Sequence, residues 1–211
     1  MGFRDDAGHP ALSSGLVHMC GRARQDRLPS DVAEMTPQAR LGAILRGEAI
    51  QGFAPYGSQD PVVCFTEAKR DGVAYLIKEK GWAPWGLVLE RDAVYQDGGG
   101  PVWYARSDVW DTLSSEIKAW AVRLEPGRAE WLHEREWRVP TPKLGLRSEM
   151  IRAVIVADPQ WHPGYVPDLG VDPASGEPEL VEVPPRLIAG VKRWCWNHAT
   201  GKFDELPPWI A

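Results

Sequence analysis

The order of apolar segments along the chain restricts its fold more than any other feature of the sequence. An early amphipathic helix is indicated, because Thr36 and Pro37 form a helix start and Leu41, Ile44 and Leu45 repeat with helical spacing. Strand-like runs then dominate, at 61–67, 86–89, 101–104, 134–139, 150–157 and 188–196. A doubly wound parallel sheet would alternate strands and helices regularly, so this order predicts a mixed α+β domain with few helices.

One domain is expected, because the 211 residues contain no long linker. Residues 1–15 are polar and Gly-rich and are expected to form a loose tail; residues 16–211 form the domain, with a Pro- and Gly-rich excursion at 163–185. The three cysteines do not suit a disulfide framework, and no apolar run reaches membrane-spanning length. The N-terminus also lacks the hydrophobic core of a signal peptide. These features predict a cytoplasmic protein with no membrane association.

The charge balance and the motifs narrow the function classes. The formal charge is 24 − 29 = −5, which argues against non-specific nucleic-acid binding through bulk charge but is compatible with a local basic groove. Neither a phosphate-binding loop nor a G-x-G-x-x-G at a helix start is present. Cys195 and His198 have metal-like spacing, but no second pair completes a zinc site, so no metal is expected.

The segment from Glu134 to Val139 carries the most informative charge pattern. In a strand, side chains alternate faces, so Glu134, Glu136 and Arg138 would share one face. Two carboxylates on a covered face repel each other and lose solvation, and something must offset that cost. A structural explanation is that Arg138 pairs with either glutamate, or that the strand lies at a solvated edge. The functional explanation is that both carboxylates line a cleft and act on a substrate.

Other residues suit either a core or a binding site. A histidine in an apolar run, such as His18, is most often a core residue, although a neutral imidazole also binds a ribose hydroxyl. Phe65 and Thr66 end a strand, where they mark its exit or present an aromatic ring and a hydroxyl to a cleft. Arg22 belongs to a small basic cluster that suits a solvated loop or a phosphate clamp, and Tyr56 lies in a predicted loop.

Several of these pieces occur in an order that resembles a known superfold. A histidine in a strand at 16–19 precedes a helix at 40–47, a strand at 63–67 follows, and the segment at 134–139 comes much later. This order resembles the ADP-ribosyltransferase superfold, with the closest likeness to AbiGi-type abortive-infection proteins and a more distant one to DNA-modifying ADP-ribosyltransferase toxins. The stretch 85–104 is also similar to the abortive-infection group. The resemblance covers roughly residues 16–156.

The resemblance implies a fold and a set of roles. The fold would have two small packed sheets with an NAD cleft between them. Glu136 would be the catalytic glutamate, and Glu134 would match the first glutamate of a paired-glutamate motif. Among the residues that contact NAD, His18 would hold the ribose and Phe65 or Thr66 would support the nicotinamide. Arg22 and Tyr56 complete the expected NAD contacts.

The function that this resemblance implies is transfer of ADP-ribose from NAD to a macromolecule, as a toxin or phage-defence effector. The acceptor would be a nucleic acid or a protein, and an antitoxin is a further possible partner. One alternative is an NAD glycohydrolase, in which water is the acceptor. The other is a binding module that has kept the fold and lost catalysis.

Overall fold

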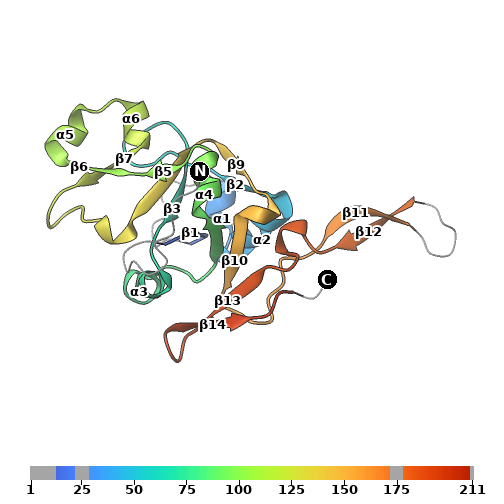
Figure 1. The fold of residues 1–211 in the computed structure, drawn as a ribbon. Coiled ribbons are helices and arrows are strands. Elements are labelled where there is room, and N and C mark those ends of the chain that lie inside the picture. Colours follow the sequence, from blue (N-terminus) through green and yellow to red (C-terminus); the bar gives the residue numbers. More distant parts are fainter. Residues whose placement is uncertain (1–12, 22–28, 172–177, 210–211) are drawn as a thin grey trace.

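The structure is a computed structural model that describes residues 13–21, 29–171 and 178–209. An eight-stranded sheet forms its centre (Figure 1). The strand order is β14 (Lys202–Leu206), β13 (Lys192–Asn197), β10 (Ile151–Val156), β4 (Gly86–Glu90), β1 (Gly15–Met19), β3 (Val62–Thr66), β8 (Glu136–Pro140) and β5 (Gly100–Pro101). Neighbouring strands are antiparallel except for β10 and β13, which are parallel.

Three two-stranded sheets and several short helices complete the fold. The small sheets are β2 (Ala49–Gln51) with β9 (Lys143–Gly145), β6 (Trp103–Arg106) with β7 (Ala121–Leu124), and β11 (Val166–Val171) with β12 (Pro178–Val183). The helices are α1 (Ser30–Glu34), α2 (Pro37–Gly47), α3 (Arg70–Lys80), α4 (Arg91–Gln96), α5 (Ser107–Thr112) and α6 (Ser115–Ala119), with 3₁₀ turns η1 (Leu132–Glu134), η2 (Ser148–Met150) and η3 (Arg186–Ile188).

The expected α+β class with few helices is confirmed, whereas the sheet arrangement differs from the expected pair of small packed sheets. The main sheet is continuous because β1 pairs with β3 on one side and with β4 on the other. Because β4 also pairs with β10, and β3 pairs with β8, these strands form one continuous sheet.

Local sequence signals explain the two longest helices. The Thr36 hydroxyl accepts a hydrogen bond from the Ala39 amide at 3.1 Å, and Pro37 occupies the first turn of α2, so this helix starts as predicted. The last turn of α3 is followed by Gly81 in the left-handed conformation, with φ at 67°.

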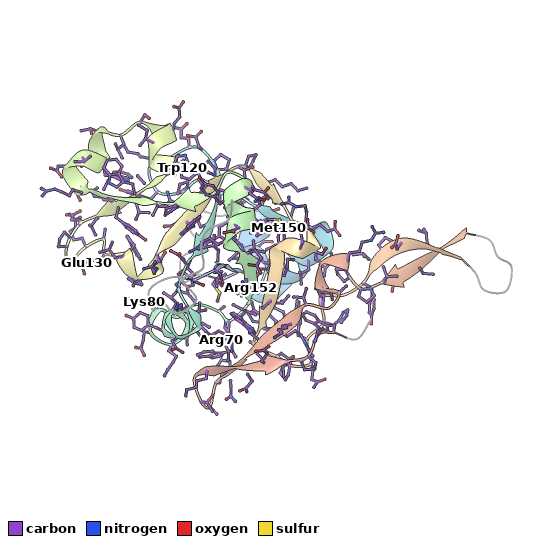
Figure 2. All side chains as sticks on the ribbon, in the orientation of Figure 1. Arg70, Lys80, Trp120, Glu130, Met150 and Arg152 are labelled. Carbon is purple, nitrogen blue, oxygen red and sulfur yellow. The ribbon has the colours of Figure 1, made fainter. Side chains whose placement is uncertain are left out.

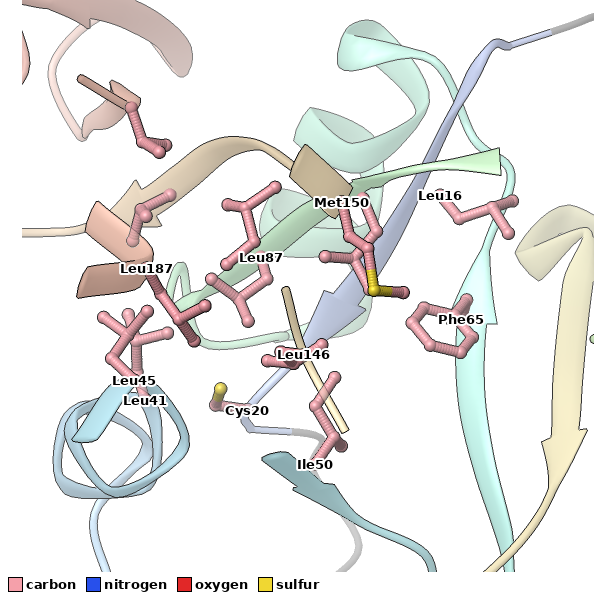
Figure 3. Close-up of a cluster of buried hydrophobic side chains, with 14 of the residues drawn as sticks. Leu16, Cys20, Leu41, Leu45, Ile50, Phe65, Leu87, Leu146, Met150 and Leu187 are labelled. Carbon is pink, nitrogen blue, oxygen red and sulfur yellow. The ribbon is translucent and has the colours of Figure 1, made fainter. Parts of the chain in front are cut away.

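Each face of the main sheet has its own core, and we name the faces by the helices that cover them. Leu16 and Phe65 lie on the α2 face, in a cluster that includes Leu41 and Leu45 of α2 (Figure 3). The other cluster, on the α3 face, combines Val17, Met19, Val88 and Ile155 of the sheet with Val73, Leu76 and Ile77 of α3. Burial of each such side chain stabilises the fold by about 1.5–3 kcal/mol, so both faces of the sheet are core surfaces.

Two parts of the chain extend from the sheet at opposite ends of the molecule. Residues 103–124, which contain β6, α5, α6 and β7 and are called the β6–β7 lobe below, lie beyond β5 (Figure 1). The β11–β12 hairpin points away on the far side, within the excursion predicted at 163–185. At the N-terminus, residues 1–12 of the expected tail lie outside the described residues, and Gly15 is already the first residue of β1.

Candidate functional site

Three neighbouring strands carry most of the residues that the sequence singled out. β1, β3 and β8 are consecutive in the sheet, although the paired positions Val62 and Pro140 of β3 and β8 are 140 − 62 = 78 residues apart in the chain. Val17 is the direct partner of Thr66, and Thr66 is the direct partner of Glu136. The next row of the sheet contains Phe65 opposite Trp137. The sheet order therefore brings the predicted residues of all three strands to one region.

The alternation of side chains divides these residues between the two faces of the sheet. Thr66 and Glu136 share the α3 face, because cross-strand partners in a ladder point to the same side. His18 lies on the α2 face, where its ring packs edge-on against Phe65 with centroids 5.8 Å apart. His18 and Phe65 therefore lie on the face opposite to Glu136, whereas the resemblance places all three in one NAD cleft. A one-residue step along a strand reverses the face, and His18 is one step from the row of Glu136.

His18 has the surroundings of a core residue. Its imidazole Nδ1 lies 2.9 Å from the backbone carbonyl oxygen of Cys64, and its side chain is half-buried. The structural explanation that the sequence left open for this histidine is therefore supported by its contacts.

Glu134 lies near Thr66 and Glu136, but it is not part of the predicted strand. It ends the 3₁₀ turn η1, and Arg135 follows with a φ of 45°, in the left-handed region that non-glycine residues seldom adopt. β8 starts only at Glu136, so the expected strand periodicity does not extend back to Glu134. Glu134 is nevertheless buried, and its backbone carbonyl accepts a hydrogen bond from the Thr66 hydroxyl. The two glutamates are neighbours of Thr66 without sharing a strand face.

Glu136 forms a buried ion pair within its own strand. Its Oε1 lies 2.9 Å from Nε of Arg138, and the exposed fractions of these residues are 5% and 6%. Nη1 of Arg138 also donates to the carbonyl oxygens of Lys118, Ala119 and Ala121, at 3.0–3.1 Å. Arg138 thus pairs with a glutamate, as the structural explanation required, and it also joins β8 to the β6–β7 lobe.

Tyr104 is a residue of this region that sequence reasoning did not assign. Its hydroxyl accepts a hydrogen bond from the Glu136 amide at 2.9 Å. Burial, together with the negative charges of Glu136 and Glu134, raises the pKa of Tyr104 above its ordinary value. No local sequence pattern identifies Tyr104, because its contact with Glu136 depends on the path of the chain from β5 of the main sheet into β6.

A second charged cluster, also missed from the sequence, lies on the α2 face. The carboxylate of Glu67, only 7% exposed, receives Nη1 of Arg91 at 2.9 Å and Nη2 of Arg135 at 3.0 Å. The indole Nε1 of Trp137 donates to the same carboxylate at 3.4 Å. Glu67 thereby fastens the end of β3 to α4 and to the turn before β8. Its partners are 24 to 70 residues away in the chain, so only the sheet order reveals the cluster.

Aromatic rings of α3, of η1 and of the residue before η1 lie close together on the surface. The ring of His133 lies 6.4 Å from that of Tyr75 in α3 and 6.4 Å from that of Trp131. Lys80 lies 5.9 Å above the Tyr75 ring. Figure 2 labels Lys80 at one end of α3 and Glu130 in the chain that leads to η1. Tyr75 and Trp131 are 47% and 38% exposed, so planar groups can contact them from solvent.

The other two residues expected to contact NAD, Tyr56 and Arg22, add no described contact to the region around Glu136. Tyr56 is exposed and stacks on Trp110 of α5, with centroids 5.3 Å apart. Arg22 lies outside the described residues. Within residues 13–21, 29–171 and 178–209, no three His, Cys, Asp or Glu side chains are placed to share a metal ion.

Two surface cavities formed by described residues have walls that include neither Thr66 nor Glu136. One, of about 400 Å³, lies between the end of α3 and the β13–β14 turn, and its walls include Trp82 and Trp196. The other, of about 330 Å³, is lined by polar residues that include Glu90 and Arg152. Neither is lined by His18, Thr66 or Glu136.

Comparisons with known proteins do not assign the chain to a family. No protein-family model, curated protein or solved structure matches it. None of the helices in the described ranges has the length and apolar content needed to cross a bilayer.

Proposed function

We propose that this chain is an NAD-consuming enzyme of the ADP-ribosyltransferase type, which transfers ADP-ribose to a macromolecule. The observation that carries the proposal is the direct pairing of Glu136 with Thr66 across two neighbouring strands, with the backbone carbonyl of Glu134 bound to the same threonine. Two buried carboxylates at the end of a sheet are costly to desolvate and are typical of functional sites. The strand order β1-β3-β8 also supports it, because it joins three of the four segments on which the resemblance rests.

The chemistry assigns a role to each carboxylate. Breaking the bond between nicotinamide and ribose develops positive charge on the anomeric carbon, which the Glu136 carboxylate stabilises without being consumed. The acceptor oxygen or nitrogen then bonds to that carbon, nicotinamide leaves, and Glu134 takes the proton released by the acceptor. Arg138 holds Oε1 of Glu136, which fixes the orientation of the carboxylate for this purpose.

The proposed site is smaller than the one inferred from the sequence. It comprises Glu136, Glu134 and Thr66 on the α3 side of the sheet. His18 and Phe65 are left out because they face the core under α2. NAD contacts by Tyr56 and Arg22 remain predictions from the resemblance alone, as do a role in toxicity or phage defence and an antitoxin partner.

A second candidate function is that of a binding module with no catalysis. It is favoured by the buried Glu136–Arg138 ion pair, which also suits a structural role, and by the position of His18 away from Glu136. An NAD glycohydrolase is the third candidate, and it would differ from the transferase only in using water as the acceptor.

One experiment separates these functions. Purified protein is incubated with NAD and mixed cell extract, and the products are identified by mass spectrometry. A macromolecule carrying ADP-ribose supports the transferase, free ADP-ribose alone supports the hydrolase, and unchanged NAD excludes both enzymes. Glu136→Gln should lower NAD turnover by roughly 10²–10³-fold, comparable to losing one oxyanion-stabilising group.

The matched control is Glu130→Gln, an exposed glutamate in the loop before η1. It makes the same chemical change a few residues away and should leave NAD turnover unaltered. Wild-type turnover in a folded Glu136→Gln protein would refute the assignment of the catalytic glutamate.

A further inference from the structure

The hydroxyl of Tyr104 lies where the strand pairing of β8 stops. β5 pairs with β8 at Trp137 and Arg138, and Val102 then donates to the Glu136 carbonyl at 3.0 Å. Beyond Val102 the chain turns into β6 and pairs with β7 instead. The Glu136 amide therefore has the Tyr104 hydroxyl oxygen as its acceptor, at 2.9 Å, in place of a strand carbonyl. The Tyr104 oxygen thus accepts the hydrogen bond from the Glu136 amide, and the hydroxyl proton can donate to a different acceptor.

The hydroxyl proton of Tyr104 has only a long contact among the described residues. The Trp131 carbonyl oxygen lies 3.5 Å from the Tyr104 oxygen, whereas hydroxyl hydrogen bonds are usually about 2.7–2.8 Å long. Tyr104 is half-buried, so this weakly bonded donor is still accessible from solvent. A ligand oxygen at normal distance would replace the contact at little cost.

Three charged groups act on this phenol. Burial disfavours its ionisation most, Glu136 and Glu134 add to this effect, and the hydrogen bond from the Glu136 amide and the charge of Arg138 oppose it. The balance raises the pKa of Tyr104, so the hydroxyl keeps its proton throughout the neutral range. It is therefore a hydrogen-bond donor under the conditions in which the glutamates would act.

We propose that Tyr104 is a substrate-binding residue whose hydroxyl donates a hydrogen bond to an oxygen of the nucleotide on which Glu136 acts. The inference rests on the proposed function, and it adds a residue from the β6–β7 lobe to a site otherwise built from β3, η1 and β8. The lobe would then contact the substrate directly, and its attachment through Arg138 would set the distance between this donor and the Glu136 carboxylate.

The test compares Tyr104→Phe with Tyr165→Phe, the same change at an exposed tyrosine beside the β11–β12 hairpin. NAD binding is measured by titration calorimetry, and folding by thermal melts. Tyr104→Phe should bind NAD about tenfold more weakly, and Tyr165→Phe should bind it as the wild type does. A purely structural role at the Glu136 amide predicts the reverse, namely a lower melting temperature with unchanged NAD affinity.

The wild-type protein supplies a second readout that needs no substitution. Its NAD affinity should decline at alkaline pH as the phenol loses its proton, and an affinity that stays constant there would overturn the inference. Wild-type NAD affinity in a folded Tyr104→Phe protein would also overturn the inference but would leave the proposed function standing. A wild-type protein that neither binds nor consumes NAD would overturn both.

Discussion

His18 and Glu136 lie on opposite faces of the main sheet, although only β3 separates the strands that carry them. Glu136 shares the α3 face with Thr66, while the His18 ring packs against Phe65 on the α2 face. A single small molecule on one face of a covered sheet cannot contact both side chains. The strands that the resemblance singled out are neighbours in the sheet, whereas the alternation of side chains decides which of their residues share a face.

His18→Ala should therefore affect stability and not NAD binding. The substitution removes the hydrogen bond to the Cys64 carbonyl and the ring contact with Phe65, which should lower the free energy of unfolding by about 1–3 kcal/mol. Thermal melts and calorimetric titration with NAD measure the two effects. The control is His198→Ala, at an exposed position in the β13–β14 turn. Weakened NAD binding at an unchanged melting temperature would return His18 to the site.

Glu134→Gln should separate transfer from hydrolysis. If Glu134 takes the proton of the acceptor, its loss should reduce formation of the ADP-ribosylated product more than total NAD consumption. The backbone carbonyl that binds the Thr66 hydroxyl is unchanged by the substitution, so the local fold should persist. The ratio of the two products, measured by mass spectrometry, reports the effect. An equal decrease in both activities would show that Glu134 only positions Glu136.

Glu67→Gln should destabilise the fold without touching the proposed site. It removes the negative charge that pairs with the guanidinium of Arg91, which is 5% exposed, and it weakens the bond from Arg135. Removing one member of a buried ion pair typically costs about 3 kcal/mol, and the partial exposure of Arg135 reduces this toward about 2 kcal/mol. Urea unfolding measures the change.

The control for this prediction is Glu205→Gln, which removes an exposed ion pair with Lys192 and should cost less than about 1 kcal/mol. If both substitutions lowered the free energy of unfolding by a similar amount, the Glu67 cluster would stabilise the fold no more than a surface ion pair does.

Stability should decline at alkaline pH because of Cys20. Burial, opposed by the charge of Arg40, raises the pKa of its thiol from 9.0 to about 12. Between these values the unfolded chain releases the proton and the folded chain keeps it, so the free energy of unfolding falls as pH rises. The slope from this group is about 1.4 kcal/mol per pH unit. Urea unfolding of the wild type and Cys20→Ala at about pH 8 and about pH 10 should show a smaller decline in the variant.

Local signals in the sequence predicted α2 and most strands of the main sheet. The N-cap at Thr36 and the aliphatic run of β10 each depend on residues close together in the chain, so each could be recognised without knowledge of the fold. The parallel pairs β6–β7 and β10–β13 carry no such signal, because pairing between distant segments is decided by the whole sheet.

The candidate site was predicted only in part for a related physical reason. Arg135 adopts positive φ without being Gly or Asn, so nothing in the sequence indicates that the strand periodicity stops between Glu134 and Glu136. The Glu67 cluster and the Tyr104 contact depend on side chains that meet across sheet rows. The sequence pattern singled out the segments, but the faces on which their residues lie depend on the strand register, which the sequence does not show.

The central place of β1 has a consequence for how the protein is made. Its five residues are synthesised before the other strands of the described residues, yet their partners β3 and β4 end at Thr66 and Glu90. β4 in turn lacks its second neighbour until β10 has been synthesised, at residues 151–156. The middle of the sheet is therefore completed late in translation, and an apolar nascent segment waits unpaired through much of it. Co-translational chaperones that bind short apolar segments would find a target at Gly15–Met19.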